Sequence, residues 1–232
     1  MAMETTTAQG SIAWMEDGEL QATCDLAAGQ YATQLFAAME RVASQAGSSL
    51  SSVDGFAVAN GPGSFTGVRV GLTVVKGLVE VWDKPAVAIS TLAAVLASRA
   101  DAASADSGGE VAALDAARGE VYFRVGREGE DRLESIEAFC RRLVGSGLRL
   151  VTPHAALAAG CGERLGADFS RRVLLAPRRL AEAVGRLGGA ELRRQLGGGR
   201  ETALRLDANY VRRSDAEIFA PPPAQIHAMG GE

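Results

Sequence analysis

The sequence predicts an α/β protein of two related lobes, each with a mixed sheet led by a β-meander. Three observations support this fold class. Short apolar runs alternate along the chain with longer segments of helical periodicity. Both halves open with a strand that ends in an acidic residue, Glu4 or Asp115, followed by a turn that reaches Gly10 or Gly119 and by a second strand. The 232 residues, 47% of them hydrophobic, are enough to bury a sizeable core.

The first half is predicted to have the order β-β-β-α-β-α-β-α. Apolar segments separated by TTTAQG and by the turn EDG indicate three opening strands. Helices are expected where apolar residues recur at helical spacing, as between Tyr31 and Ala46, or where an N-cap serine such as Ser90 precedes the run. The expected elements are strands at 1–4, 11–15 and 20–26, a helix at 31–46, a strand at 55–60, a helix at 66–82, a strand at 86–89 and a helix from 90 to about 99.

A polar segment rich in small residues, 97–110, marks the expected boundary between the lobes. A second meander then begins, with two strands inside 110–125 around the turn DAARG. The elements expected after it are a Ser135-capped helix, a strand at 148–151, a helix at 154–165, a strand at 172–176 and a long helix at about 178–196. We therefore expect a first lobe at 1–105, a second lobe at 106–219 and a disordered proline- and glycine-rich tail at 220–232.

The composition is that of an ordinary soluble protein. The formal net charge is −4, whereas proteins that bind nucleic acid directly usually carry a basic excess. The three cysteines, Cys24, Cys140 and Cys161, are scattered, which is typical of reduced thiols in a cytoplasmic protein. The sequence has no signal segment and no run approaching about 18 uncharged apolar residues, so we expect a cytoplasmic protein without a membrane partner.

A glycine-rich stretch, GPGSFTGVRVG at 61–71, follows a predicted strand and precedes a predicted helix, where phosphate-binding loops occur. A P-loop ends in Gly-Lys-Ser/Thr, but here the glycine is followed by valine and arginine. The dinucleotide fingerprint fails by one residue, and Pro62 has no N–H to offer a phosphate. We therefore expect the loop to be structural and to aim the following helix. The residues given this role are Gly61, Pro62, Gly63, Ser64, Phe65, Thr66, Gly67 and Arg69.

Candidate catalytic groups are scarce. The hairpins with which ATPases of the actin, Hsp70 and sugar-kinase type grip phosphate need a glycine beside the acid, but METTTAQG has threonines there and LDAARG has alanines. Glu4 and Asp115 could face one cleft, although acids at strand ends are more often capping or solvated groups. His154 and His227 do not have the i, i+4 spacing of a metal pair. We therefore assign no catalytic, cofactor-binding or metal residue and expect no cofactor.

The helices at 31–46 and 66–82 are expected to form one exposed apolar face. In the second helix, glycines and branched apolar residues recur at i+3 and i+4, a pattern that accepts another helix at close range. Each glycine inside a helix lowers its stability by about 0.5–1 kcal/mol relative to alanine. Gly71 and Gly77 therefore indicate packing so close that it leaves no room for a Cβ atom. The residues expected to form the face are Tyr31, Leu35, Met39, Val70, Gly71, Val74 and Leu78.

Four segments together resemble the TsaB (YeaZ) family: METTTAQGSIA, AVANGPGSFTGVRVG, LDAARGEVYF and NYVRRSDAE. The glycine-rich loop is the most specific of them. The turn of the second lobe, fairly specific, contributes Asp115, Arg118, Gly119, Glu120 and Tyr122. The resemblance implies two RNase H-like lobes of the actin/Hsp70/sugar-kinase type. It also implies a non-catalytic accessory subunit of the bacterial complex that forms N6-threonylcarbamoyladenosine beside the anticodon of tRNA.

The resemblance further implies partners. These are the TsaD transferase subunit, the TsaE ATPase, a second copy of the chain when it is alone, and tRNA only through the complex. The helical face would serve the homodimer and TsaD in turn. Family members typically have a histidine where Tyr31 stands, a proline where Ala208 stands and a longer lead-in to the first strand, which bears on the partner contact and on where the first strand begins. A stand-alone ATPase or kinase of the same fold and a direct tRNA-binding protein remain the alternatives.

Overall fold

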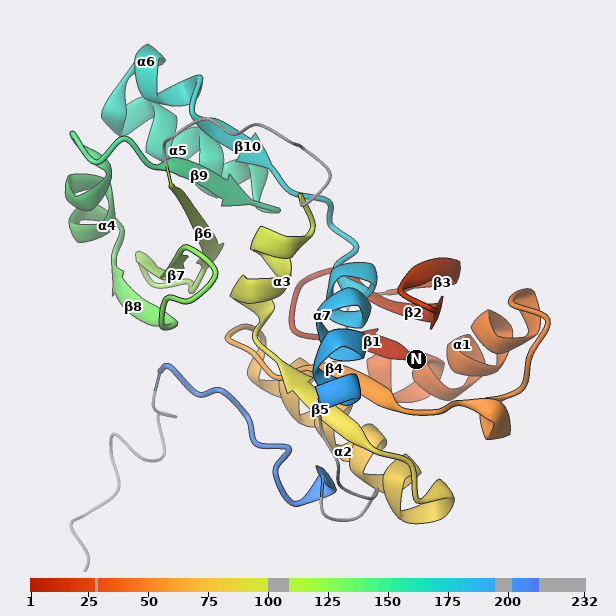
Figure 1. Ribbon diagram of the computed structural model, residues 1–232. Helices are drawn as coiled ribbons and strands as arrows, with labels where there is room; N and C mark the ends of the chain where they lie inside the picture. The colour runs from red at the N-terminus through yellow and green to blue at the C-terminus, as the bar shows by residue number, and fades with distance from the viewer. Residues whose placement is uncertain (28, 100–108, 195–201, 213–232) are drawn as a thin grey trace, which may run out of the picture.

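The computed structural model describes residues 1–27, 29–99, 109–194 and 202–212, which form two α/β lobes (Figure 1). The sheet of the first lobe has the strand order β3-β2-β1-β4-β5. Its first three strands pair antiparallel as a meander, and β4 and β5 add in parallel beyond β1. The strands are β1 (Ala2–Glu4), β2 (Gly10–Glu16), β3 (Glu19–Leu26), β4 (Phe56–Ala59) and β5 (Ala86–Ile89).

The second sheet repeats this topology strand for strand, in the order β10-β9-β6-β7-β8. Its meander is again antiparallel, and β9 and β10 again add in parallel beyond the first strand. The strands are β6 (Glu110–Asp115), β7 (Glu120–Val125), β8 (Arg132–Ser135), β9 (Arg149–Thr152) and β10 (Val173–Leu175). The predicted fold class, an α/β protein of two mixed sheets led by β-meanders, is confirmed.

Helices cover both faces of the first sheet. Side chains alternate between the two faces of a strand, so Met3 and Ile12 face one core cluster while Ala2 and Ala13 face the other. The first cluster lies under α1 (Tyr31–Gln45) and α2 (Phe65–Trp82), which touch one another, and the 3₁₀ turn η1 (Leu50–Ser52) follows α1. The second cluster lies under α7 (Ala181–Arg194).

The position of α7 differs from the sequence prediction. The sequence places a long helix at about 178–196 in the second lobe, but α7 packs on the first sheet (Figure 1). A Cβ atom added to Gly188 would come within 2.2 Å of the Ala57 Cβ, so this helix lies unusually close to β4. The second lobe therefore lacks this helix. The predicted boundary lies largely outside the described residues, as the tail at 220–232 does entirely, and the division at 105 and 106 stays a prediction.

The second lobe has its own core, and one helix joins the two lobes. The helices α4 (Ile136–Leu143), α5 (Ala155–Leu165) and α6 (Ala167–Ser170) enclose a cluster that includes Phe123 and Phe139. The predicted cap of α4 is present, because the Ser135 Oγ accepts a hydrogen bond from the Ala138 N–H. Leu92 and Val95 of α3 (Thr91–Ala97) pack among second-lobe residues and form a buried apolar joint between the lobes.

Among the helices that the structure describes, none is both long enough and apolar enough to cross a membrane.

Candidate functional site

The glycine-rich loop packs directly on the turn between β1 and β2. The Thr5 Oγ1 donates to the Gly67 carbonyl at 2.7 Å, and the Ser64 N–H donates to the Thr6 carbonyl at 2.7 Å. A Cβ added to Gly63 would lie 2.3 Å from the Thr6 carbonyl oxygen, and one added to Gly67 would lie 1.8 Å from the Thr5 carbonyl oxygen. Both glycines are therefore explained by contact with the chain's own backbone, without a ligand.

The carboxylate of Glu4 points into the β1–β2 turn and binds its backbone and side chains. It accepts hydrogen bonds from the Thr6 N–H at 2.5 Å, the Thr6 Oγ1 at 2.7 Å, the Thr7 N–H at 2.9 Å and the Thr7 Oγ1 at 2.9 Å. Burial raises the pKa of the Glu4 carboxyl, against the lowering effect of these hydrogen bonds. Glu4 has no place in the wall of the cavity between the lobes, whereas Asp115 does. The two acids therefore do not form a facing pair.

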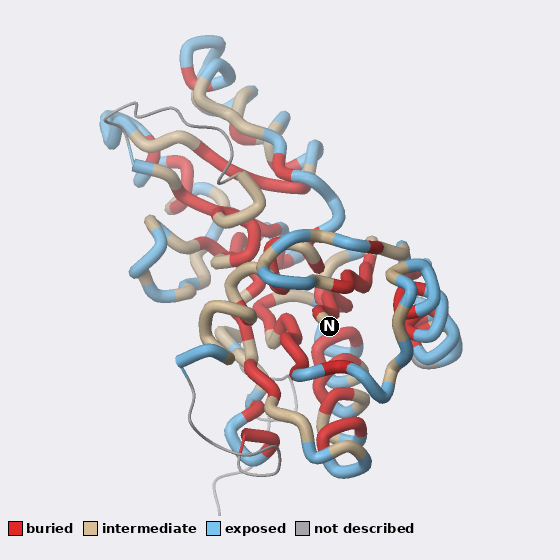
Figure 2. The backbone as a smooth tube through the Cα atoms, turned by 45° about the vertical axis from the view of Figure 1, so that its right-hand side comes forward, coloured by how far each residue is buried: buried red, intermediate tan, exposed pale blue. Residues whose placement is uncertain are grey.

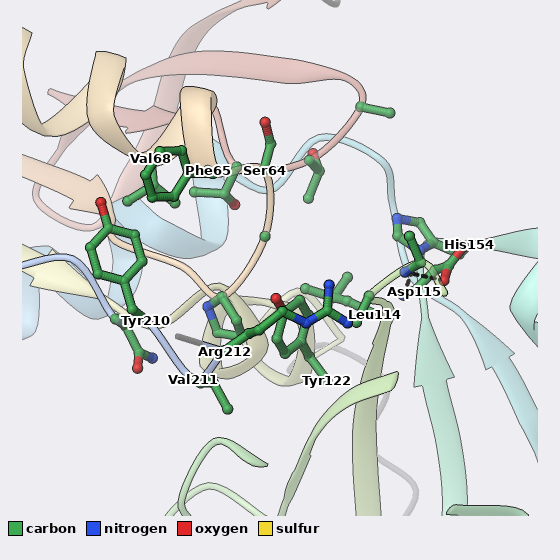
Figure 3. A pocket seen from close by; sticks show the side chains of 18 of the residues that line it. Ser64, Phe65, Val68, Leu114, Asp115, Tyr122, His154, Tyr210, Val211 and Arg212 are labelled. Carbon is green, nitrogen blue, oxygen red and sulfur yellow. Dashed lines mark hydrogen bonds between the residues drawn. The ribbon is translucent and has the colours of Figure 1, made fainter. Parts of the chain in front are cut away.

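A cavity of about 1000 Å³ lies between the lobes (Figure 3). Its walls come from the β1–β2 turn, the starts of α1 and α2, the β6–β7 turn, His154 and the segment 209–212. Tyr31 stands at the start of α1, where its hydroxyl donates to the Thr7 carbonyl at 2.6 Å. The cavity thus combines aromatic rings with charged side chains from both lobes.

The β6–β7 turn holds the second-lobe signature residues in a tight conformation. Its backbone is left-handed from Ala117 to Gly119, with φ values between +54° and +75°. The Asp115 Oδ1 accepts from the Ala117 N–H at 2.8 Å and stabilises the turn. The Asp115 N–H donates to the His154 Nδ1 at 3.0 Å (Figure 3). His154 is therefore held as the neutral tautomer with its proton on Nε2.

His154 makes the folded state sensitive to mild acid. Burial, with a further contribution from Arg178, lowers the pKa of His154, while Asp115 acts in the opposite direction. Below the pKa of an unfolded histidine, about 6.5, the folded protein binds fewer protons than the unfolded chain. The contribution of neutral His154 to the unfolding free energy is therefore complete above that pH and is lost as the pH falls through it. Asparagine can keep the acceptor for Asp115 without titrating.

We accordingly expect wild-type protein to lose more unfolding free energy than His154→Asn between pH 7 and pH 5, measured by urea unfolding at each pH. Equal losses in the two proteins would show that His154 does not titrate in this range with a lowered pKa.

The expected association face is wrong in most of its residues. Tyr31, Leu35, Met39, Gly71 and Leu78 are buried within this chain, and only Val70 and Val74 are half-buried. The apolar stripes that the sequence shows on α1 and α2 are the stripes that pack on the first sheet (Figure 2). A Cβ on Gly71 would lie 2.6 Å from the Thr5 Oγ1, so this notch is filled by the β1–β2 turn and not by a partner helix.

A second stripe on the same two helices does face outward. Phe36 is 54% exposed and Val81 is 74% exposed, and a Cβ on Gly77 would meet no atom within 4 Å. On α2, the residues Val70, Val74, Gly77 and Val81 follow the spacing i, i+4, i+7 and i+11, which places them on one side of the helix. We call this surface the outer face, made of Phe36, Ala37, Val70, Val74, Gly77 and Val81.

Three of the residues that join the lobes around the cavity, Asn209, Arg212 and Asp131, were not predicted as site residues, whereas Glu120 was. Asn209 donates from its Nδ2 to the Asp131 Oδ2, 78 positions away, and Arg212 forms an ion pair with Glu120. The motif that contains Asn209 and Arg212 is visible in the sequence, but no local pattern shows what it contacts. Asp131 lies in a polar connection without any distinguishing signal.

Comparison with known proteins gives one matching family model. Residues 24–150 match the model described as "TsaD: tRNA N6-adenosine threonylcarbamoyltransferase". Two curated relatives are each named "tRNA threonylcarbamoyladenosine biosynthesis protein TsaB". The one from Haemophilus influenzae is 35% identical over 123 residues, which are 53% of this chain and 51% of the relative. The one from Escherichia coli is 32% identical over 125 residues, which are 53% of this chain and 52% of the relative. The chain thus aligns with about half the length of these relatives.

Solved structures are similar over more of the chain. A structure described as YeaZ from Pseudomonas aeruginosa has a TM-score of 0.65 and 29% identity, and the match covers 87% of this chain and 97% of that one. Another, an uncharacterized Pseudomonas aeruginosa protein with similarity to peptidase YeaZ, has a TM-score of 0.66, 23% identity and coverage of 91% and 98%, and supports the fold alone.

Proposed function

The chain belongs to the TsaD family of tRNA N6-adenosine threonylcarbamoyltransferase proteins, and on that premise we propose that it is a non-catalytic accessory subunit in the synthesis of N6-threonylcarbamoyladenosine beside the anticodon of tRNA. The resemblance to TsaB (YeaZ) is confirmed by relatives and a solved structure of that name. The observation that carries the non-catalytic role is the β1–β2 turn, where the acid is taken up by Thr6 and Thr7 and the glycine-rich loop covers the backbone.

The remaining chemistry of the described residues supports the same proposal. The Nδ1 of His154 is occupied by a backbone N–H, and Asp115 stabilises its own turn. Within residues 1–27, 29–99, 109–194 and 202–212, no group of three or more histidine, cysteine or acidic side chains is placed to hold a metal ion. General acid–base or metal-assisted catalysis needs such groups free and convergent.

The proposed partners follow from the family and from the outer face. The TsaD transferase subunit docks on the outer face of α1 and α2, and a second copy of this chain occupies it when TsaD is absent. The TsaE ATPase joins the complex in the cytoplasm. This chain contacts tRNA only as part of that complex. The supporting observation is an exposed apolar stripe with an open glycine notch at Gly77, because a helix can approach closely there.

A reconstituted assay tests the function. Purified TsaD, TsaE and tRNA from the same organism are combined with Mg²⁺-ATP and an activated threonylcarbamoyl donor labelled in its threonine part, with and without this chain, and the label entering tRNA is counted. We expect modification to depend on the chain, and we expect the chain alone to release no phosphate from Mg²⁺-ATP. Phosphate release by the purified chain, or modification that proceeds equally without it, would favour the stand-alone ATPase or kinase instead.

A further inference from the structure

Seven residues near the end of the described chain, 206–212, run from the first lobe toward the second (Figure 1). Leu206 is buried in the core beneath α1 and α2. Beyond it the segment pairs with Asn60, the residue that follows β4. The Asn209 N–H donates to the Asn60 carbonyl at 2.8 Å, and the Asn60 Nδ2 donates to the Asp207 carbonyl at 2.9 Å. These contacts fix the segment to the first lobe.

The same segment then reaches a carboxylate that both lobes share. The Asn209 Nδ2 donates to the Asp131 Oδ2 at 2.5 Å. That oxygen also accepts from the Oγ of Ser90, the first-lobe cap of α3, at 2.7 Å. The other oxygen of Asp131 pairs with the Arg124 Nη1 of β7 at 3.0 Å, and the Asp131 side chain is only 6% exposed. Asp131 is therefore a buried anchor, and its hydrogen-bond partners come from both lobes.

Two further residues extend the attachment along the second lobe. Arg212 forms an ion pair with Glu120, and its guanidinium lies 5.8 Å from the centre of the Tyr122 ring (Figure 3). Val211 packs against the cluster that surrounds the α3 joint. Residues 209–212 also line the cavity, so the segment crosses between the lobes on the cavity side.

Between these attachments, Tyr210 reaches the start of α2. Its ring lies 5.4 Å from the ring of Phe65, and its hydroxyl accepts a hydrogen bond from the Arg69 Nε at 3.1 Å. The Arg69 guanidinium in turn lies 3.8 Å over the Phe65 ring. The first turn of α2 is thus in contact with the segment that bridges the lobes.

We propose that residues 206–212 are a clasp that fixes the two lobes relative to one another across the cavity and ties their arrangement to the first turn of α2. The clasp holds the second lobe mainly through hydrogen bonds and an ion pair, whereas the α3 joint is a buried apolar contact. The Arg212–Glu120 ion pair is partly exposed beside the cavity, so water can replace it, and the clasp opens from this end while the buried contact at Asp131 and the apolar joint persist. The clasp contacts the first turn of α2 through Tyr210, and α2 carries the outer face. On the basis of the proposed function, opening of the clasp therefore regulates the binding of a partner to the outer face.

Distances between spin labels test the clasp in the full chain. In a Cys24→Ser background, labels are placed at two exposed positions, Glu19→Cys on β3 and Glu137→Cys on α4. The test variant combines Asn209→Ala with Arg212→Ala, and the control is Leu204→Ala, an 83% exposed residue just before the clasp. We expect a longer and broader distance distribution in the double variant, with the control like wild type and all melting curves cooperative. A wild-type distribution in the double variant would overturn the clasp.

The connection to α2 is tested separately with Tyr210→Ala. The affinity of purified TsaD for this variant is expected to fall at least tenfold relative to wild type, with the Leu204→Ala affinity unchanged. An unchanged affinity would overturn the link between the clasp and α2. If wild-type chain itself fails to bind TsaD, the proposed function fails, while the distance measurement still decides whether the clasp holds the lobes.

Discussion

Gly67→Ala is expected to destabilise the protein by about 3 kcal/mol, the upper part of the range for overpacked sites. The new Cβ would lie 1.8 Å from the Thr5 carbonyl oxygen. Because this oxygen belongs to the backbone, no flexible side chain can move away to relieve the clash. Relief requires α2 to move away from the β1–β2 turn, which also breaks the 2.7 Å hydrogen bond from the Thr5 Oγ1. Urea unfolding followed by circular dichroism measures the loss as a lower midpoint.

Gly77→Ala on the same helix is the matched control. Nothing lies within 4 Å of its added Cβ, so only helix propensity acts, and we expect a gain of about 0.5–1 kcal/mol. The pair separates two glycines that look alike in the sequence. A Gly67→Ala midpoint equal to wild type would contradict the packing of the glycine-rich loop on the β1–β2 turn.

Secondary structure was predicted correctly where the local sequence pattern was strong. The helix predicted at 66–82 is found at Phe65–Trp82, where the Ser64 side chain caps its start, and the one predicted at 154–165 is found at Ala155–Leu165, where Gly166 ends it. The strand β8 was missed. Its four residues, RLES, lie at the edge of the second sheet, and none is buried. A short, polar edge strand does not show the alternation by which strands are predicted.

Placement was less predictable than secondary structure. An amphipathic pattern shows which side of a helix is apolar, but not which surface covers that side. Leu35 and Met39 were therefore expected at a partner contact and are found on the chain's own sheet. The helix α7 was likewise expected beside its neighbours in sequence and packs on the first lobe, where Gly185 and Gly188 allow close approach. Such contacts join residues far apart in the chain, and single-sequence patterns do not report them.

Gly77→Arg is expected to abolish association through the outer face. The side chain projects from the centre of the exposed stripe of α2, where free space lets it fit the monomer without strain. An unpaired cation buried in a helix-pair contact costs about 3 kcal/mol, which weakens binding by roughly a hundredfold. We expect a monomer by sedimentation at concentrations where wild type dimerises, and loss of the dependence of tRNA modification on this chain.

Gly189→Arg on α7 is the matched control, because it places the same substitution inside a helix on the opposite side of the first sheet, where only the end of the flexible Arg193 side chain is near. It should keep both dimerisation and stimulation. Gly71→Arg is unsuitable, since the clash of its Cβ with Thr5 would test folding in place of association. If Gly77→Arg is folded by circular dichroism and still dimerises and supports modification like wild type, the partner surface does not include the outer face of α2, and the arginine-rich second lobe becomes the surface to test.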